Sequence, residues 1–202
     1  MNPKETIAAF DFDGTITTRD SLLPLLFFSN NISVTLLKLS LLAPYFLLFV
    51  LGLYSRQKTK EKILTSFFKG KTKEEMQLLG ESYARSKLPS LVKKEALEKI
   101  SWHASQGHRL FIVSASIDCY LTPWAKEKGF EGVISSKLDY DEQGRVKGTL
   151  LGQNCWGEEK VKKLFNAIQQ DPSSVILYAY GDSKGDQALL NKANYSYYKK
   201  FN

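Results

Sequence analysis

The chain has 202 residues, of which 43% are hydrophobic and 24% are charged, and its formal net charge is +7. This composition excludes intrinsic disorder, and the length allows one domain with a large insertion or two small domains. The positive charge favours anionic partners such as phosphate esters or an anionic lipid surface. Nucleic acid is not expected, because no basic-aromatic RNA module, zinc-ligand spacing or helix-turn-helix signature is present.

The cysteine content and the amino terminus indicate the compartment. Cys119 and Cys155 lie far apart and form no Cys-x-x-Cys motif, which suits a reducing environment. Residues 1–5 lead directly into an apolar run and contain no signal-peptide core. We therefore expect a cytoplasmic protein.

The first predicted strand, residues 6–10, runs directly into Asp11-Phe12-Asp13-Gly14-Thr15. Two carboxylates at this spacing leave an extended backbone on the same side, and Gly14 lets the chain turn after them. Such a pair can hold a cation, combine a nucleophile with an acid–base group, cap a helix or lie in a solvated turn.

The segment after this motif is strongly apolar. Residues 21–37 and 39–55 carry no charge and are separated only by Lys38, although asparagine, proline and glycine interrupt both runs. We expect two or three helices here. They either pack on each other and on the core, leave one face apolar to rest on a membrane or admit a lipid tail, or span a membrane.

A basic segment follows, in which seven bases between Arg56 and Lys73 face a single acid, Glu61. Apolar residues interleave at helical spacing, which predicts an amphipathic helix whose lysines lie mostly in solvent. Arg56 differs, because it begins the segment where the chain could return toward the first motif. Another helix is expected from a cap at Thr72 to Ser86, and residues 88–90 mark the end of the insertion.

The rest of the chain alternates helices and strands, the pattern of a parallel sheet. We expect helices at 90–106, 117–128, 158–169 and 183–191, strands at 109–113, 132–135, 175–180 and 195–198, and a hairpin at 137–151 turning at Gln143-Gly144. His103 and His108 lack metal-ligand spacing, and we expect them to have surface or packing roles.

Polar groups recur where the later strands end. Ser114 follows the strand at 109–113, and Gly181-Asp182-Ser183-Lys184-Gly185-Asp186 follows the strand at 175–180. Lys160 lies in the first turn of a helix, where the helix dipole does not favour a base unless the amine faces an anion. Because open α/β sheets build active sites at the carboxyl ends of their strands, we expect these groups to converge with Asp11.

In type, order and placement, these four motifs resemble those of the haloacid dehalogenase-like superfamily. The similarity is to its phosphoserine-phosphatase-like branch, subfamily IB, in which a helical cap is inserted after the first motif. It extends from Asp11 to Asp186 and so covers nearly the whole chain. It implies an α/β fold with a Rossmann-like parallel sheet flanked by helices, a core domain at residues 1–17 and 89–202, and an all-helical cap domain at 18–88.

The resemblance also implies a chemistry, the hydrolysis of a phosphomonoester through an aspartyl-phosphate with Mg²⁺ as cofactor. Asp11 would attack phosphorus, and Asp13 would protonate the leaving group and then activate water. The implied metal site comprises Asp11, the backbone carbonyl of Asp13, and Asp182, with Asp186 holding a metal-bound water or ordering Lys160.

The same resemblance assigns the phosphate contacts. Ser114 and the amide of Ala115 would bind phosphate oxygens. Lys160 would neutralise the charge shared by the phosphate and Asp11.

The substrate is less defined by these motifs. In phosphoserine-specific relatives an acid after the first motif and a cap arginine hold the amino acid, and Asp20 and Arg56 are the nearest counterparts here. However, Asp20 is shorter than the usual glutamate, and Ser114-Ala115-Ser116 stands in place of the usual Ser-Gly-Gly. The apolar insertion and residues 154–160 are more similar to the branch that contains bacterial phosphatidylglycerophosphate phosphatase C.

Several functions therefore stay open. The first is hydrolysis of a small soluble phosphomonoester such as a phosphoserine-like metabolite. The second is hydrolysis of a lipid phosphate by a peripheral protein at the inner membrane face. A non-catalytic membrane-surface or partner-binding module with this fold, and a mutase or phosphotransferase, are the remaining alternatives.

Overall fold

The structure is a computed structural model that describes residues 4–201. Its centre is a five-stranded sheet in the order β3-β2-β1-β6-β7, in which every neighbouring pair is parallel. The strands are β1 (Glu5–Phe10), β2 (Arg109–Ile117), β3 (Gly132–Ser136), β6 (Val175–Gly181) and β7 (Tyr195–Tyr198). The predicted α/β fold with a parallel sheet is confirmed.

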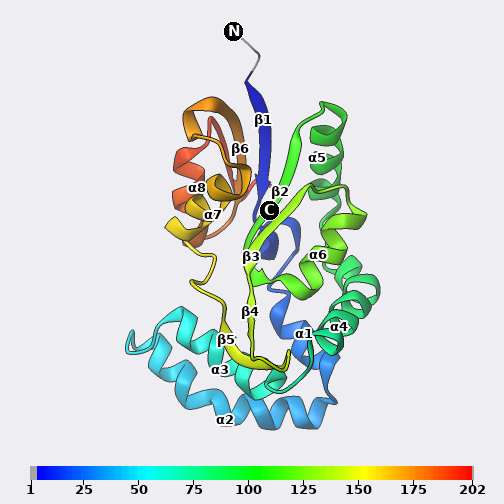
Figure 1. Cartoon of the computed structure of the whole chain (residues 1–202), viewed down its shortest axis with the longest axis vertical. Coiled ribbons are helices and arrows are strands. Elements are labelled where there is room, and N and C mark those ends of the chain that lie inside the picture. Colours follow the sequence, from blue (N-terminus) through cyan, green and yellow to red (C-terminus); the bar gives the residue numbers. More distant parts are fainter. Residues whose placement is uncertain (1–3, 202) are drawn as a thin grey trace.

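Helices cover both faces of this sheet (Figure 1). Helices α5 (Lys94–Ser105) and α6 (Asp118–Glu127) lie on one face, and α7 (Glu158–Ile168) and α8 (Gln187–Lys192) lie on the other. Along β1, Ala8 and Phe10 join the apolar cluster on the α5 side, whereas Ile7 and Ala9 join the cluster on the α7 side. The uninterrupted apolar run of β1 therefore reflects burial on both faces.

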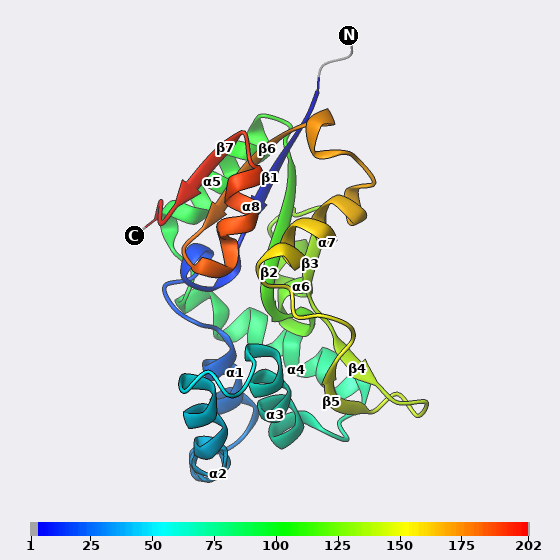
Figure 2. The ribbon, with the colours of Figure 1, turned by 90° about the vertical axis from the view of Figure 1, so that its left-hand side faces the viewer.

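Four helices lie beyond the carboxyl ends of the strands, at the end of the molecule away from the start of β1 (Figures 1 and 2). They are α1 (Leu22–Ser29), α2 (Ile32–Val50), α3 (Arg56–Phe68) and α4 (Lys73–Ser86). The apolar segment thus forms two helices, as expected. Thr72 caps α4 as predicted, because its hydroxyl accepts a bond from the Glu75 amide while the Glu75 side chain accepts one from the Thr72 amide.

Three predicted boundaries are wrong, and in the first two local pairing overrides the apolar pattern. The helix expected at 90–106 starts only at Lys94, because Thr17 pairs with Val92 and the Lys93 amide donates to the Ile16 carbonyl. Strand β2 continues beyond residue 113 to Ile117, which pairs with β3 after a register shift. The helix expected at 183–191 begins as a 3₁₀ turn, Lys184–Asp186, before α8.

The predicted hairpin consists of β4 (Leu138–Tyr140) and β5 (Val146–Leu150), which pair antiparallel. It lies against α3 rather than joining the main sheet. The Gly70 amide donates to the Val146 carbonyl at 2.9 Å, and the Thr65 hydroxyl donates to the Gly148 carbonyl at 3.3 Å. The hairpin therefore fixes the inserted helices to the sheet-containing part of the chain.

The packing role expected for His103 is confirmed. The ring is fully buried and packs edge-on against Phe10, with Nε2 2.9 Å from the Tyr180 hydroxyl and Nδ1 2.7 Å from Nδ1 of His108. Burial, together with the charges of His108 and Lys99, lowers the pKa of His103 to about 4.

This neutral histidine makes acid destabilise the fold. Between its ordinary pKa of about 6.5 and the folded value, the unfolded chain binds a proton that the folded chain does not, so stability falls as pH falls. We expect His103→Gln to remove about 3 kcal/mol of this fall in the free energy of unfolding, measured by urea titration at a series of pH values. His108→Gln, at a half-buried ring, should change the slope less. Parallel curves for wild type and His103→Gln would show that His103 is not the titrating group.

Candidate active site

Asp11 follows the last residue of β1, and its carboxylate forms an ion pair with Lys160. The carboxylate is 6% exposed, and its Oδ1 lies 2.5 Å from Nζ of Lys160, which reaches across from the first turn of α7. Burial raises the pKa of Asp11 to about 7, with the charges of Asp186 and Asp13 adding to the shift and Lys160 opposing it. Lys160 lies where the dipole of its helix disfavours a cation, and it is paired there with a buried carboxylate. Its position in the sequence indicated such an anionic partner.

Asp186 holds the same lysine from the opposite side. Its Oδ1 lies 2.5 Å from Nζ of Lys160, and its Oδ2 accepts bonds from the Ser183 hydroxyl at 2.7 Å and the Ser183 amide at 2.9 Å. Burial disfavours the charged forms of Lys160 and Asp186, but their mutual attraction and hydrogen bonds favour them more strongly. The pKa of Lys160 is therefore raised and that of Asp186 is lowered. Asp186 thus contacts Lys160 directly, and its role in ordering this lysine stays a prediction.

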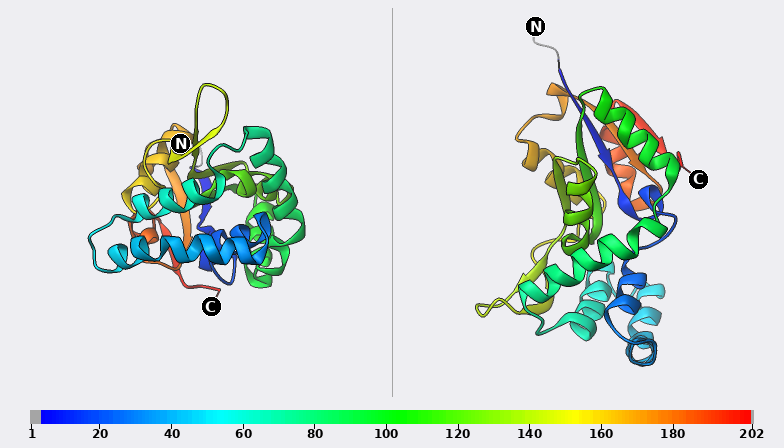
Figure 3. Two further views of the ribbon diagram at one scale, coloured as in Figure 1. Left: turned by 90° about the horizontal axis from the view of Figure 1, so that it is seen from below. Right: turned by 90° about the vertical axis from the view of Figure 1, so that its right-hand side faces the viewer.

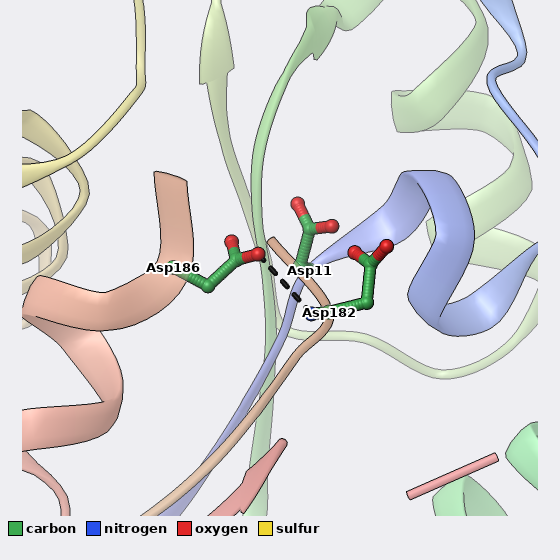
Figure 4. Close-up of side chains that lie close together, drawn as sticks. All are labelled: Asp11, Asp182 and Asp186. Atoms are coloured by element: carbon green, nitrogen blue, oxygen red, sulfur yellow. Dashed lines mark hydrogen bonds between the residues drawn. The ribbon is translucent and has the colours of Figure 1, made fainter. Parts of the chain in front are cut away.

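Asp182 completes an acidic cluster at the strand ends. Asp11, Asp182 and Asp186 each place a carboxylate oxygen within 4.8 Å of the others, and Figure 4 shows the first two carboxylates side by side. The Thr15 hydroxyl lies between them, 3.4 Å from Oδ2 of Asp11 and 3.2 Å from Oδ1 of Asp182. Three close carboxylates beside one lysine form an oxygen-only donor set with excess negative charge, which fits a hard divalent cation.

The turn after Asp11 depends on Gly14. Its φ is +77°, in the region that favours glycine, and a Cβ at this position would overlap the Asp182 carboxylate. Gly14 thus lets the first motif approach the acidic cluster.

Asp13 has different partners from Asp11. Its Oδ1 accepts a bond from the Ser21 amide at 2.8 Å, and its Oδ2 accepts one from the Ser116 hydroxyl. Burial and the charge of Asp20 raise the pKa of Asp13 to about 6, while the bonds from Ser116 and Ser21 oppose the shift. A carboxyl group with this pKa can exchange a proton near neutral pH.

Ser114 and Ala115 lie in β2, beside the first motif. Ser114 is buried, and its hydroxyl oxygen accepts a bond from the Ser116 amide at 3.1 Å. The Ala115 carbonyl accepts a bond of 2.5 Å from Nζ of Lys60. The segment from 114 to 116 is therefore held from two sides, by its own serine and by α3 of the insertion.

The two candidate substrate residues lie farther from these groups. Asp20 is exposed and caps α1, because its Oδ1 accepts bonds of 3.0 Å from the amides of Leu22 and Leu23. Arg56 is also exposed, and its guanidinium stacks over the rings of Phe49 and Trp156 at 5.5 Å and 5.2 Å. The charge of Asp20 acts on Asp13, whereas Arg56 forms no hydrogen bond or ion pair with the acidic cluster within residues 4–201.

Lys60 and Ser116 are the side chains at this site that the sequence did not single out. Lys60 was expected in solvent, but it is half-buried and also donates to Oδ1 of Asn154 at 2.8 Å. The signal was its position, one turn after Arg56 and one turn before the buried Leu64. Ser116 was noted only as a departure from the usual glycine, although a hydroxyl at that place reaches Asp13.

Comparison with known proteins agrees with this geometry. A model of the haloacid dehalogenase-like hydrolase family matches residues 8–191. The protein CicA of Caulobacter vibrioides is 30% identical over 203 residues, which cover 100% of this chain and 89% of CicA.

Solved structures share the fold at lower identity. A protein from Bordetella pertussis Tohama I has a TM-score of 0.80 at 19% identity, covering 94% of this chain and 87% of that one. A phospho-aspartyl intermediate analogue of phosphoserine phosphatase has a TM-score of 0.61 at 16% identity, with coverages of 95% and 84%. On the family match and the CicA similarity, the chain belongs to the haloacid dehalogenase-like hydrolases.

Proposed function

We propose that the chain is a Mg²⁺-dependent phosphatase that hydrolyses phosphomonoesters through a phosphorylated Asp11. The observation that carries this proposal is that one turn bears two carboxyl groups with different partners. Asp11 lies against Lys160 and the acidic cluster, whereas the carboxyl oxygens of Asp13 are held by the Ser116 hydroxyl and the Ser21 amide. One group is placed to bond to phosphorus and the other to move a proton.

The acidic cluster is the proposed Mg²⁺ site. Asp11 and Asp182 would hold the ion together with the backbone carbonyl of Asp13, and Asp186 would contribute indirectly through the order it imposes on Lys160. When bound, Mg²⁺ would polarise the phosphoryl group and offset its negative charge.

The first chemical step is the attack of an Asp11 oxygen on phosphorus. A new bond forms between that oxygen and phosphorus, and the ester bond between phosphorus and the leaving oxygen breaks. Lys160, 2.5 Å from Asp11, offsets the charge gathered there. Asp13, whose pKa is raised to about 6, donates its proton to the leaving alkoxide so that an alcohol departs.

The second step regenerates the enzyme. Asp13, now a carboxylate, takes a proton from water while the water oxygen attacks phosphorus. The bond between phosphorus and Asp11 breaks, and inorganic phosphate leaves. Ser116 and the Ser21 amide hold both oxygens of Asp13 in place, which keeps the same carboxyl group available for both proton transfers.

The phosphate contacts would come from β2 and the insertion. We assign the Ser114 hydroxyl and the Ala115 amide to phosphate oxygens. Lys60 fixes the Ala115 carbonyl and thereby orients this segment from α3. In this proposal residues 18–88 form a cap domain over a core of residues 1–17 and 89–202, and a single antiparallel bridge between Thr17 and Val92 lies at the junction.

A small soluble phosphomonoester, such as a phosphoserine-like metabolite, is the first candidate substrate. A lipid-linked phosphomonoester is the second, and one observation favours it. A cavity of about 690 Å³ adjoins Asp20 and is lined mainly by apolar side chains, with two cations at its border. The lining includes Leu23, Pro24, Phe27, Phe28 and Leu91, with Arg19 and Lys87.

Phosphate release tests the proposed function directly. We expect Mg²⁺-dependent release from at least one member of a panel of phosphoserine, sugar phosphates, nucleotides and phosphatidylglycerophosphate in mixed micelles. Chelation with EDTA should lower the rate at least about 10²-fold, and added Mg²⁺ should restore it. The preference between soluble and micellar substrates separates the two candidates. No release from any substrate by folded protein that binds Mg²⁺ would favour the non-catalytic alternative.

A further inference from the structure

Large apolar side chains are exposed at one end of the molecule. They lie on α1, on α2 and in the turn after α2, whereas exposed apolar residues elsewhere are scattered. The set comprises Leu23, Phe27, Ile32, Val34, Leu36, Leu37, Leu41, Leu47, Val50, Leu51 and Leu53. Large apolar side chains gathered in this number on neighbouring elements mark a docking site in a folded protein.

Helix α2 contributes most of this surface. It has 19 residues with a mean hydropathy of 1.9, and only Thr35 and Leu42 are buried. Within α2, Ser33 and Ser40 are the exposed polar residues. By length and composition alone, α2 is sufficient to cross a membrane.

The packing of its neighbours shows that α2 lies along the surface instead. Before α2, Leu25 and Leu26 of α1 are buried, and after it Leu64 and Phe68 of α3 are buried, all in the same apolar cluster. A helix that crossed a bilayer would place α1 and α3 on opposite sides of it. The inner side of α2 also packs on that cluster through Leu42.

Cations border the apolar surface. Nζ of Lys62 lies 5.0 Å from the centre of the Tyr45 ring, and Nζ of Lys58 lies 6.0 Å from that of Tyr54. No acidic residue occurs between Ser21 and Lys60. An apolar face with a cationic border is complementary to anionic lipid headgroups over acyl chains. A second copy of this chain would present the same cations, which oppose one another.

We propose that this face docks on an anionic phospholipid bilayer. Helix α2 lies in the plane of the interface, its exposed leucines enter the boundary between headgroups and acyl chains, and the α3 cations contact the headgroups. Figure 3, in the view from below, looks onto this face, with α2 crossing it and α3 beside it. The docking is a property of the insertion and does not require the proposed phosphatase chemistry.

Vesicle flotation without substrate tests the proposal. We expect the wild-type chain to float with vesicles of phosphatidylcholine and phosphatidylglycerol, and less with phosphatidylcholine alone or at high NaCl. The double variant Leu41→Glu with Leu47→Glu should bind at least about tenfold more weakly, because both side chains would enter the lipid boundary. These leucines are 67% and 60% exposed, and the matched control Leu78→Glu, at a leucine that is 66% exposed on α4, should bind as wild type does.

A second double variant tests the contribution of the α3 cations to binding separately from that of the apolar side chains. Lys58→Glu with Lys62→Glu should reduce flotation with anionic vesicles at least about tenfold and leave weak binding to neutral ones unchanged. Equal thermal unfolding of all variants establishes that each is folded. Absence of flotation with anionic vesicles at low salt would overturn the proposal. So would a wild-type dimer in sedimentation analysis that Leu41→Glu with Leu47→Glu dissociates, since the face would then bind a second copy.

Discussion

The Asp11→Asn variant is expected to lose more than about 10³-fold in kcat while keeping the wild-type fold. The amide cannot form the phosphoryl bond that the carboxylate forms. The fold should persist because Lys160 retains its second partner, Asp186, at 2.5 Å. The measurement is steady-state phosphate release at saturating Mg²⁺ on the best substrate of the panel, with thermal unfolding recorded for the same samples.

The same substitution at an aspartate outside the site controls for the loss of one negative charge. Asp139 pairs with Lys147 in the hairpin, away from the acidic cluster, so Asp139→Asn should retain wild-type kcat. Asp11→Asn activity within tenfold of wild type would mean that another group attacks phosphorus. In that case the Mg²⁺-dependent hydrolysis would not proceed through a phosphorylated Asp11.

Asp13→Asn should lower kcat about 10²- to 10⁴-fold on an alkyl phosphate, the range for a lost general acid–base group. The reason is that an alkoxide leaves poorly without a proton, and Asp13 is the carboxyl group whose oxygens are held by the Ser116 hydroxyl and the Ser21 amide. With an aryl phosphate, whose leaving group needs no proton, formation of the aspartyl-phosphate should be much less impaired. Hydrolysis of the aspartyl-phosphate should still be slow, so a burst of aryl alcohol should precede a low steady-state rate.

Ser116 provides the graded test of this assignment. Ser116→Ala removes the hydrogen bond to Asp13 and should lower kcat on the alkyl phosphate about tenfold, whereas Ser116→Thr retains the hydroxyl and most of the rate. Rapid-mixing measurements with both substrate types check these results. Equal losses of Asp13→Asn on alkyl and aryl phosphates, without a burst, would show that Asp13 does not protonate the leaving group.

The sequence was most informative where function depends on strand ends. The apolar run before Asp11, the run before Asp182 and the unfavourable helix position of Lys160 together indicated groups that converge, and the structure brings them within hydrogen-bonding distance or a few ångströms. These signals are local, since each needs only a buried strand and the residue after it. The roles of these residues in catalysis remain proposals.

The contributions from the insertion were not predictable in the same way. Lys60 belongs to a run of lysines that most simply faces solvent, and only the packing of α3 on the hairpin turns it toward Ala115 and Asn154. Ser116 depends on β2 continuing to Ile117, which the apolar pattern did not predict. Such contacts join segments far apart in the chain, and no periodicity in a single sequence encodes them.

Trapping the covalent adduct shows whether Asp11 becomes phosphorylated during turnover. Turnover would be quenched with acid within the burst, the acyl phosphate reduced with borohydride, and the modified peptide mapped by mass spectrometry. We expect modification at Asp11 in wild type, greater modification at Asp11 in Asp13→Asn, and none at that position in Asp11→Asn. A phosphoryl group found on Ser114 or another side chain, or continued turnover with no trapped adduct, would contradict the phosphorylation of Asp11.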